Sequence, residues 1–441
     1  MANNLKTVCL VSLGCPKNLV DSEIMLGMLK AAGLDIVTDR AAADVIIVNT
    51  CGFLESAAKE SVDEILGLAE YKEKRCRMLI VAGCLTQRYK GELERELSEV
   101  DCFIGTGEYH KIADVVKNGP KERVMAGIST YVHDYSTPRI LSTPSHFAYV
   151  KIAEGCSNLC SYCTIPSIRG AFRSRTIDSV VREAEDLAKA GVKEINLIAQ
   201  DITSFGRDLK GADLPKLVRS LAKVGGIEWI RLLYLYPSRI TDGLIKVIRD
   251  EDKVCKYIDM PVQHISTRVL KAMNRSGTKT GIKDVIKRIR RAIPDVTLRT
   301  SIIAGFPGET EKEFKELLTF VEETGFERLG VFKYSKEDGT PAARLSGQLT
   351  EKVKAARFRR LMGCQKKISL KKNKALIGST IKVLIEAKGS FDGYSLVGRA
   401  STQAPEVDGV TYIKEGSAAP GDIVEARVKN VSAYDLMAEI A

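Results

Sequence analysis

The stretch of sequence that decides the fold is GCSNLCSYCTIP, residues 155–166, in which Cys156, Cys160 and Cys163 form a Cys-x3-Cys-x2-Cys triplet. Three closely spaced thiolates can ligate three irons of a cubane iron–sulfur cluster. The fourth iron is then left without a protein ligand and is free to bind a substrate. An electron-transfer protein normally closes that position with a fourth cysteine, so the triplet predicts a cluster that takes part in chemistry.

Zinc binding and simple packing are the alternatives for these cysteines. Structural zinc takes four closed ligands, usually as two Cys or His pairs. No second pair follows the triplet, and the nearby His146 precedes an expected strand on its far side. The spacing, with the aromatic Tyr162 directly before the last cysteine, resembles the radical S-adenosylmethionine (SAM) superfamily instead. That resemblance implies a [4Fe-4S] cluster, SAM as the source of a 5′-deoxyadenosyl radical, and a reductant protein that supplies the electron.

Length and composition set the broad class. At 441 residues the chain is expected to hold two or three domains. Its 11 cysteines follow no signal-like start, which favours metal ligation in a reducing, cytoplasmic compartment over disulfides. No apolar run approaches the length of a membrane span, so we expect no membrane contact.

Three further cysteines each follow a strand-like run in the first part of the chain. The runs are TVCLVSLGC (7–15), DVIIVNTC (44–51) and RMLIVAGC (77–84), and they end at Cys15, Cys51 and Cys84. Apolar strands separated by helical segments indicate a parallel, doubly wound sheet, whose ligands bind beyond the carboxyl ends of the strands. One cysteine at that position could be an ordinary buried residue. Three at the same offset favour a second three-cysteine cluster site, while five others are expected to be core or incidental: Cys9, Cys76, Cys102, Cys255 and Cys364.

From residue 146 onward the chain repeats strand–helix units. We count about six such units, fewer than the eight of a closed barrel, and expect a partial (βα)-barrel with functional residues at the carboxyl ends of its strands. Candidate SAM contacts at such ends are Tyr162, Gln200, Arg231, Gln263, His264, Gly305 and Gly308. Each has an ordinary structural alternative; the Gly305–Gly308 turn, for example, could simply begin a helix.

The remaining segments complete a three-domain plan with an α/β fold. Residues around 120–145, which include STPRILSTPS (136–145), are turn-rich and indicate a linker, and residues 343–372 indicate a basic helix. Short alternating strands in 373–441 predict a small five-stranded β-barrel. We therefore expect an N-terminal domain with an auxiliary cluster (1–138), a radical SAM core ending in the basic helix (139–372), and the barrel (373–441).

The order of these features resembles the radical SAM methylthiotransferases over nearly the whole chain, and the terminal barrel resembles a TRAM domain. The resemblance implies that Cys15, Cys51 and Cys84 ligate an auxiliary [4Fe-4S] cluster and that Cys156, Cys160 and Cys163 ligate the SAM-binding one. It also implies two uses of SAM: one molecule donates a methyl group to sulfur, and a second is cleaved to the radical that activates the substrate carbon.

Branches of this family modify one of two adenosine derivatives in tRNA or an aspartate of a small-subunit ribosomal protein. Three stretches resemble the protein-modifying branch: SLGCPKNLVDSE (12–23), EGCSNLCSYCTIPSIRGAFRSR (154–175) and DMPVQHIS (259–266). The tRNA enzymes typically differ where Pro-Lys-Asn stands here. The implied substrate is the β-carbon of an aspartate in ribosomal protein S-twelve.

Charge distribution gives a separate argument about the partner. The net charge is +11, and residues 343–372 alone carry ten basic side chains against one acidic. The barrel segment has seven basic and nine acidic side chains. An RNA-gripping barrel should be basic, whereas an acidic one attracts a basic ribosomal protein. The acidic residues concerned are Asp392, Glu406, Asp408, Glu415, Asp422, Glu425 and Asp435.

Three alternatives remain open at this point. The acidic side chains could only solubilise the barrel, and the basic helix could contact ribosomal RNA or be a solvated face. A methylthiotransferase acting on a modified adenosine of tRNA is the second reading of the function. A non-catalytic iron–sulfur protein of the ribosome, whose clusters sense redox state, is the third.

Overall fold

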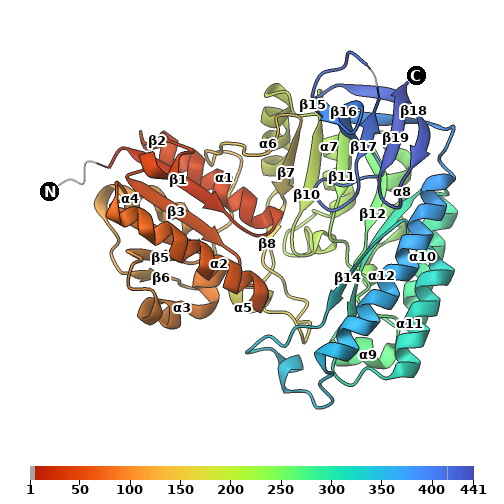
Figure 1. Cartoon of the computed structure of the whole chain (residues 1–441), viewed down its shortest axis with the longest axis horizontal. Coiled ribbons are helices and arrows are strands. Elements are labelled where there is room, and N and C mark those ends of the chain that lie inside the picture. Colours follow the sequence, from red (N-terminus) through yellow and green to blue (C-terminus); the bar gives the residue numbers. More distant parts are fainter. Residues whose placement is uncertain (1–4, 415) are drawn as a thin grey trace.

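The structure is a computed structural model that describes residues 5–414 and 416–441. It consists of an N-terminal α/β unit, a central α/β unit and a C-terminal barrel that packs beside the central sheet (Figure 1). Glu415, one of the acidic residues named above, lies outside the described residues. In the described part of the chain, no helix is both long and apolar enough to cross a membrane.

The N-terminal unit is built on a six-stranded, all-parallel sheet of order β2-β1-β3-β4-β5-β6. The strands are β1 (Thr7–Ser12), β2 (Asp35–Ile36), β3 (Val45–Thr50), β4 (Met78–Gly83), β5 (Cys102–Ile104) and β6 (Val124–Met125). The helices are α1 (Pro16–Ala31), α2 (Glu55–Ala69), α3 (Cys84–Glu96) and α4 (Ile112–Asn118). Helices α1 and α4 pack on one face of the sheet and α2 and α3 on the other, so the expected doubly wound arrangement is confirmed.

The central unit is a second parallel sheet of six strands, ordered β14-β13-β12-β11-β10-β7. The strands are β7 (Phe147–Lys151), β10 (Glu194–Ile198), β11 (Trp229–Leu232), β12 (Val254–Asp259), β13 (Thr297–Ala304) and β14 (Arg328–Lys333). The connecting helices are α6 (Ile177–Lys189), α7 (Leu214–Ala222), α8 (Asp242–Asp250), α9 (Thr267–Ala272), α10 (Lys279–Ala292) and α11 (Glu311–Thr324). The sheet does not close between β14 and β7, which confirms the partial barrel.

The basic helix α12 (Glu351–Lys374) begins eight residues later than the expected position 343. A short 3-10 turn (Pro341–Arg344), capped by the Thr340 side chain, occupies the preceding segment. The chain then passes through Gly347 at φ +75° before the helix begins. These turn residues, rather than charge, set the start of α12, which packs along β14 and α11.

The C-terminal unit is a closed barrel of five strands in the order β15-β16-β17-β19-β18. The strands are β15 (Thr380–Phe391), β16 (Tyr394–Ala400), β17 (Thr411–Ile413), β18 (Ile423–Val431) and β19 (Leu436–Ile440). The pairing of β17 with β19 is parallel, and the other four pairings are antiparallel. The expected small barrel is confirmed.

The expected linker around residues 120–145 contains the short strand β6, and its last part, the turn-rich stretch 136–145, is tightly held. Glu23 of α1, which is fully buried, accepts hydrogen bonds from the Arg139 guanidinium and from the backbone N–H of Ser142. Arg139 also pairs with Glu183 of α6. The turn-rich composition predicted the absence of regular structure correctly, but the segment joins the N-terminal and central units firmly.

Much of the barrel's acidity faces the central unit or its own turns. The Tyr257 hydroxyl donates to Asp408 at 2.7 Å, and the Tyr149 hydroxyl donates to Glu406 at 3.0 Å. Asp422 and Asp435 accept backbone N–H groups within turns of the barrel. Only Asp392 and Glu425 of the described acidic residues named above are exposed and without such a bond. Four of the six described acidic residues, Asp392, Glu406, Asp422 and Glu425, are exposed, so an acidic contact surface on the barrel stays a prediction.

Candidate functional site

Cys15, Cys51 and Cys84 meet at the carboxyl edge of the N-terminal sheet, as their positions after successive strands predicted. Strands β1, β3 and β4 are direct neighbours in the sheet. Cys15 is the N-cap of α1, Cys51 directly follows β3, and Cys84 is the first residue of α3. The chain order reverses between β1 and β3, and such a switch point is where ligands bind in open α/β sheets.

Two glycines allow the cysteine loops to approach one another. A Cβ on Gly14 (φ +93°) would lie 2.9 Å from Cβ of Cys51 and 3.3 Å from its sulfur. A Cβ on Gly83 (φ +100°) would lie 2.3 Å from Oδ1 of Asn49 and 2.7 Å from the carbonyl oxygen of Thr50. Both positions combine left-handed backbone with a contact that only glycine tolerates.

The triplet lies on the loop after the first central strand and the short β8 (Ala153–Glu154), and it leads into α5 (Ile165–Arg169). The backbone N–H of Cys156 donates to the carbonyl of Gly170, and that of Cys163 donates to the carbonyl of Cys160. These bonds fold the loop back on itself beside α5. Burial raises the pKa of the Cys156 and Cys163 thiols, and the neighbouring Cys160 raises both further.

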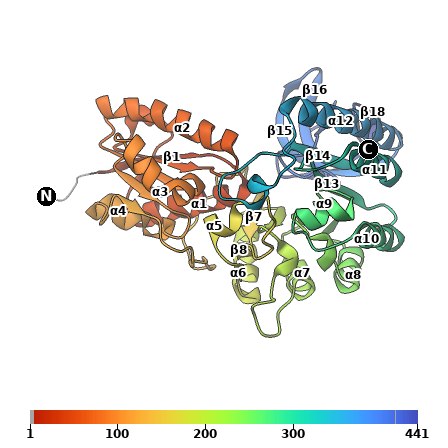
Figure 2. The same ribbon diagram turned by 90° about the horizontal axis from the view of Figure 1, so that it is seen from below.

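The segments that carry the two cysteine sets adjoin at the boundary between the N-terminal and central units. The Thr164 hydroxyl, next to Cys163, donates to the carbonyl of Phe53, two residues after Cys51. Nη2 of Arg169, at the end of α5, lies 3.6 Å from the sulfur of Cys84. Figure 2 shows α5 between the N-terminal unit and the central sheet.

A buried network of charges reinforces this junction. Arg169 pairs with Asp21 of α1 at 2.9 Å and with Glu154 at 3.0 Å. Lys151 of β7 also pairs with both of these carboxylates. Burial by itself raises the pKa of Glu154, but Arg169 and Lys151 outweigh that effect and lower its pKa overall. A buried charge this well paired is costly to break, so the relative position of the two units is rigidly set.

The donor sets fit iron–sulfur clusters better than single metal ions. Within the described residues, no three His, Cys, Asp or Glu side chains are placed to hold one ion. Cubane ligands instead bind separate irons and so surround a cluster without converging on a point. Burial raises the pKa of Cys84 and of Cys163 to about 12 each, so these thiols need a bound metal to become thiolates.

Among the candidate SAM contacts, Tyr162 and Gln200 lie near the triplet. The Tyr162 hydroxyl accepts a hydrogen bond from Arg275 at 3.3 Å. The Gln200 amide donates to Glu154 at 3.3 Å, and its buried Oε1 has no partner among the described atoms. Gln263 is in the left-handed region (φ +67°) after β12, and its buried Oε1 is likewise without a described partner.

The Gly305–Gly308 turn and His264 form a second group of candidates. Glu309 accepts the backbone N–H groups of Gly305 and Phe306 and pairs with Arg357 of α12 at 2.9 Å. The backbone N–H of Gly308 donates to the carbonyl of Gly347. His264 is fully buried, and burial lowers its pKa to about 3, so it is a neutral core side chain.

The structure does not bring Arg231 to the triplet. Its Nε donates to Glu194 at 2.8 Å, and its Nη1 donates to the carbonyl of Ser401 in the barrel at 2.8 Å. Arg231 is fully buried between the central sheet and the barrel. Arg231 lies near the end of a strand as predicted, but its side chain connects the central sheet to the barrel and does not reach the triplet.

Other residues beside the triplet carried no signal in the sequence. Nη1 of Arg275 lies 3.8 Å from the sulfur of Cys160, and its guanidinium lies over the ring of Tyr236. Asn158, within the triplet loop, donates to Asp201 at 3.0 Å and accepts from Arg239. Each of these side chains is polar and unremarkable in its own stretch, and only the fold brings them together.

The five cysteines outside the two sets, which were expected to be core or incidental residues, pack against apolar clusters. Cys9 and Cys76 belong to one apolar cluster of the N-terminal unit, and Cys102 and Cys255 belong to another. Cys364 packs at the edge of the central core.

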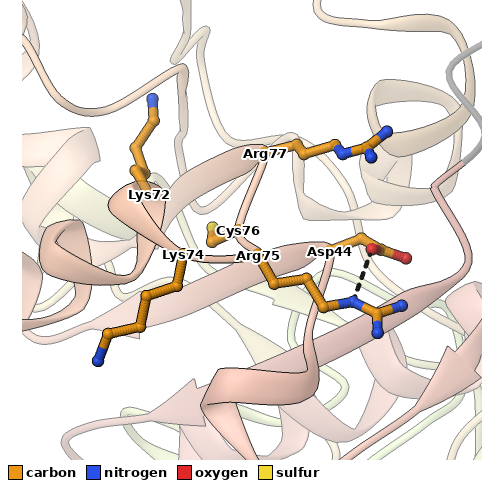
Figure 3. Close-up of a pocket in the computed structure, with 6 residues that line it drawn as sticks. All are labelled: Asp44, Lys72, Lys74, Arg75, Cys76 and Arg77. Atoms are coloured by element: carbon orange, nitrogen blue, oxygen red, sulfur yellow. Dashed lines mark hydrogen bonds and ion pairs between the residues drawn. The ribbon is translucent and has the colours of Figure 1, made fainter.

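A separate basic recess lies at the opposite, amino edge of the N-terminal sheet (Figure 3). Arg75 pairs with Asp44 at 3.0 Å, and Lys72 pairs with Asp101 at 2.8 Å. Cys76 is buried in the core beneath the recess. The side chains of Lys74 and Arg77 extend away from Cys76 in Figure 3. The recess therefore has no thiol available and is remote from the edge that carries the cysteines.

The fold and the cysteine sets define a radical SAM protein of three parts, and family models agree. Residues 7–105 match the model described as Uncharacterized protein family UPF0004, residues 150–321 match the Radical SAM superfamily, and residues 377–441 match the TRAM domain. The radical SAM methyltransferase TsrM from Kitasatospora setae has the same fold over much of the chain. The TM-score is 0.59 at 15% identity, covering 77% of this chain and 74% of that one.

Full-length relatives specify the family. The ribosomal protein uS12 methylthiotransferase RimO of Geobacter sulfurreducens is 54% identical over 445 residues, covering 100% of both chains. The protein of the same name from Geotalea uraniireducens is 53% identical over 446 residues, again covering 100% of both. The chain belongs to the ribosomal protein uS12 methylthiotransferase family of radical SAM enzymes, whose cofactors are SAM and [4Fe-4S] clusters.

Proposed function

We propose that this protein adds a methylthio group to the β-carbon of an aspartate in ribosomal protein uS12, the S-twelve protein of the small subunit. One observation carries the proposal: the segments that hold the two three-cysteine sets adjoin through the Thr164–Phe53 and Arg169–Cys84 contacts. Hydrogen abstraction and sulfur transfer must act on the same carbon, so their two centres have to be neighbours. The full-length similarity to proteins named as uS12 methylthiotransferases supports the choice of substrate.

We assign the six cysteines as cluster ligands, with Cys15, Cys51 and Cys84 holding the auxiliary cluster and Cys156, Cys160 and Cys163 the SAM-binding one. When bound, the clusters and SAM supply the radical and the methylated sulfur. Tyr162, Gln200, Gln263, Gly305 and Gly308 are the proposed SAM-contacting residues. The domain boundaries at 138/139 and 372/373 likewise stand as a proposal. The first lies between β6 and β7, and the second lies two residues before the end of α12 at Lys374.

The chain's own residues orient the donors and exclude water. We call the edge of the N-terminal sheet that carries Cys15, Cys51 and Cys84 the auxiliary edge. Asn18 donates there to the carbonyls of Leu13 and Thr50, and its Oδ1 accepts from Arg169. The Cys84 thiol donates to the same Oδ1. Arg275 holds Tyr162 and approaches Cys160 from the other side of the triplet. These contacts fix loops that would otherwise move, and preorganisation of this kind lowers the cost of reaching a reactive geometry.

A division of labour between the two sets is directly testable. Cys156→Ala should abolish reductive cleavage of SAM, because it removes a ligand of the SAM-binding cluster. Cys51→Ala should still cleave SAM and form 5′-deoxyadenosine, but it should no longer methylthiolate uS12. Mass spectrometry of uS12 and chromatography of 5′-deoxyadenosine, after incubation of reconstituted enzyme, SAM and a reductant, measure both outcomes.

Cys364→Ala, which changes an incidental cysteine, is the matched control and should retain both activities. Continued methylthiolation of uS12 by the Cys51 variant would contradict the assignment. Purified tRNA, incubated in parallel, tests the second candidate function: a methylthio group found on tRNA and not on uS12 would replace the proposed substrate. Absence of 5′-deoxyadenosine from the reduced parent enzyme would favour the non-catalytic alternative.

We further propose two contacts with the ribosomal partner. The exposed Asp392 and Glu425 are the acidic side chains through which the barrel would meet the basic uS12. The exposed basic side chains of α12 would meet ribosomal RNA, in keeping with the match of the adjoining barrel to the TRAM domain. A reductant protein and a cytoplasmic location, where small subunits are present, complete the proposal.

A further inference from the structure

Lys17 is a buried cation at the auxiliary edge that the proposed reaction has not used. It lies in the first turn of α1, two residues after Cys15, and only 7% of it is exposed. Its ammonium nitrogen lies 2.9 Å from the ring centroid of Tyr234, which follows β11 of the central unit. Lysine is rarely buried this deeply unless it is paired.

The Lys17 ammonium has no carboxylate partner. Among residues 5–414 and 416–441, no Asp or Glu oxygen lies within 4.0 Å of it, and no hydrogen bond from it is formed. The negative groups that act on it most strongly are Cys15, then Asp259 and Glu154, and only the last two are carboxylates. The Tyr234 ring offsets part of the charge through its π face, but a buried ammonium is expected to have an anion as well.

The two nearby carboxylates are already engaged with other groups. Asp259 accepts from Arg299 at 2.8 Å and from the backbone N–H of Tyr234 at 2.9 Å. Glu154 is shared by Arg169 and Lys151. Turning either carboxylate toward Lys17 would break an existing ion pair of Arg299, Arg169 or Lys151. A carboxylate from outside the chain can pair with Lys17 without such a loss.

We propose that Lys17 binds the side-chain carboxylate of the substrate aspartate and thereby selects an acidic residue. The inference rests on the proposed function and deepens it. Lys17 projects from the auxiliary edge, next to exposed Cys15, and reaches the central unit at Tyr234. A carboxylate held there keeps the adjoining β-carbon between the two cysteine sets, which is where a carbon that meets both must be.

The test pairs a change in the enzyme with a change in the substrate. Binding of uS12 carrying Asp or Asn at the modified position is measured by fluorescence anisotropy, using reconstituted full-length enzyme with SAM and no reductant. For the parent enzyme we expect the Asn form to bind about 10- to 100-fold more weakly, because a charge-assisted hydrogen bond is lost. Lys17→Met should weaken binding of the Asp form by a similar factor and lose the preference for Asp over Asn.

Two further variants keep the result interpretable. Lys17→Arg retains the cation and should recover a measurable preference for Asp. Lys30→Met makes the same change on the exposed end of α1, where Lys30 pairs with Asp35, and should behave as the parent. Iron content and slow, substrate-free formation of 5′-deoxyadenosine should be unchanged in all variants, which shows that the clusters are assembled.

Retention of the Asp preference by Lys17→Met would overturn the inference. So would loss of SAM cleavage in that variant with its iron content intact, because Lys17 would then act on the cofactor's carboxylate. Failure of the parent enzyme to bind or modify uS12 at all is a different result and would reject the proposed function itself.

Discussion

At the scale of single residues, the site depends on side chains that no motif distinguishes. Cysteine positions after strands were enough to place all six candidate ligands at strand ends, three in the N-terminal unit and three in the central unit. The sequence could not show that Asn18 would join the carbonyls of Leu13 and Thr50 to the Cys84 thiol. Nor could it show that Lys17 would be buried, because its neighbours in α1 lack a clear apolar stripe. These roles arise from contacts across units, which local patterns do not contain.

Gly83 provides a residue-scale prediction. Gly83→Ala should lower the free energy of unfolding by about 1–3 kcal/mol, because alanine is strained at φ +100°. The added Cβ also displaces Asn49, which donates to the carbonyl of Asn18 and so supports the auxiliary edge. We therefore expect a lower iron content after reconstitution, measured together with denaturant unfolding.

Gly67→Ala is the matched control for this change. Gly67 lies inside α2, and no atom is within 4 Å of the position of its added Cβ. Alanine favours a helix interior over glycine by about 1 kcal/mol, so this variant should be slightly more stable with full iron content. Equal iron content in the two variants would mean that the auxiliary edge does not need Gly83.

At the scale of elements, α12 shows how a pattern can mislead. Its buried positions are mostly polar or charged: Arg357, Leu361, Gln365, Ser369 and Asn373, spaced four residues apart. Gln365 donates to the carbonyl of Phe326, and Asn373 donates to the carbonyls of Ser432 and Ala433 in the barrel. Hydropathy alone therefore reads the helix as solvated throughout. In fact it connects the central unit to the barrel and leaves only its other face exposed.

That exposed face carries the element-scale prediction. Arg359, Lys366 and Lys367 recur at helical spacing, are exposed, and have no ion pair in the described structure. Changing all three to Gln should weaken binding to the small ribosomal subunit. The slope of log affinity against log salt should fall by roughly two to three, about one for each phosphate contact removed.

A second triple variant tests whether the loss of three positive charges has the same effect at another place on the surface. Lys59, Lys117 and Lys121 are exposed lysines of the N-terminal unit, and changing them to Gln removes the same charge. This variant should keep the parent's salt dependence. Equal slopes for both triple variants would show that α12 does not contact RNA phosphates.

At the scale of the whole molecule, the three units and their order followed from the sequence, whereas their mutual placement did not. Strand periodicity and turn composition predicted two parallel sheets and a small barrel. The contact between the central unit and the barrel depends on Glu194, which is buried between Arg231 and Arg399. Those residues are 37 and 205 positions away from it in the chain, so no local pattern could indicate the pairing.

Glu194→Gln is the prediction at this scale. The change leaves the buried Arg231 without its carboxylate and leaves Arg399 paired with Glu386 alone. It should lower the free energy of unfolding by about 3–5 kcal/mol at pH 7. Burial by itself raises the pKa of Glu194, but Arg399 and Arg231 outweigh it and lower that pKa overall. The stabilisation is therefore present above the ordinary Glu pKa of about 4.3 and is lost as pH falls through the lower, folded value.

Denaturant unfolding of parent and variant across that pH range measures the effect. The difference between them should be largest at neutral pH and should shrink in acid. Glu228→Gln, an exposed change close to the same edge, should produce almost no difference at any pH. A pH-independent gap for Glu194→Gln would mean that its charge contributes nothing to the contact.

The Arg169 junction also implies an order of events during biogenesis. Its partners Asp21, Asn18 and Cys84 come from the N-terminal unit, while Glu154 comes from the central one. Once the units dock, Cys84 is only 4% exposed, whereas Cys15 remains open to solvent. We therefore expect iron and sulfide to reach Cys84 more readily before the two units dock than afterwards. Maturation would then have a direction, in which metal reaches the cysteines of the N-terminal sheet first and docking of the two units follows.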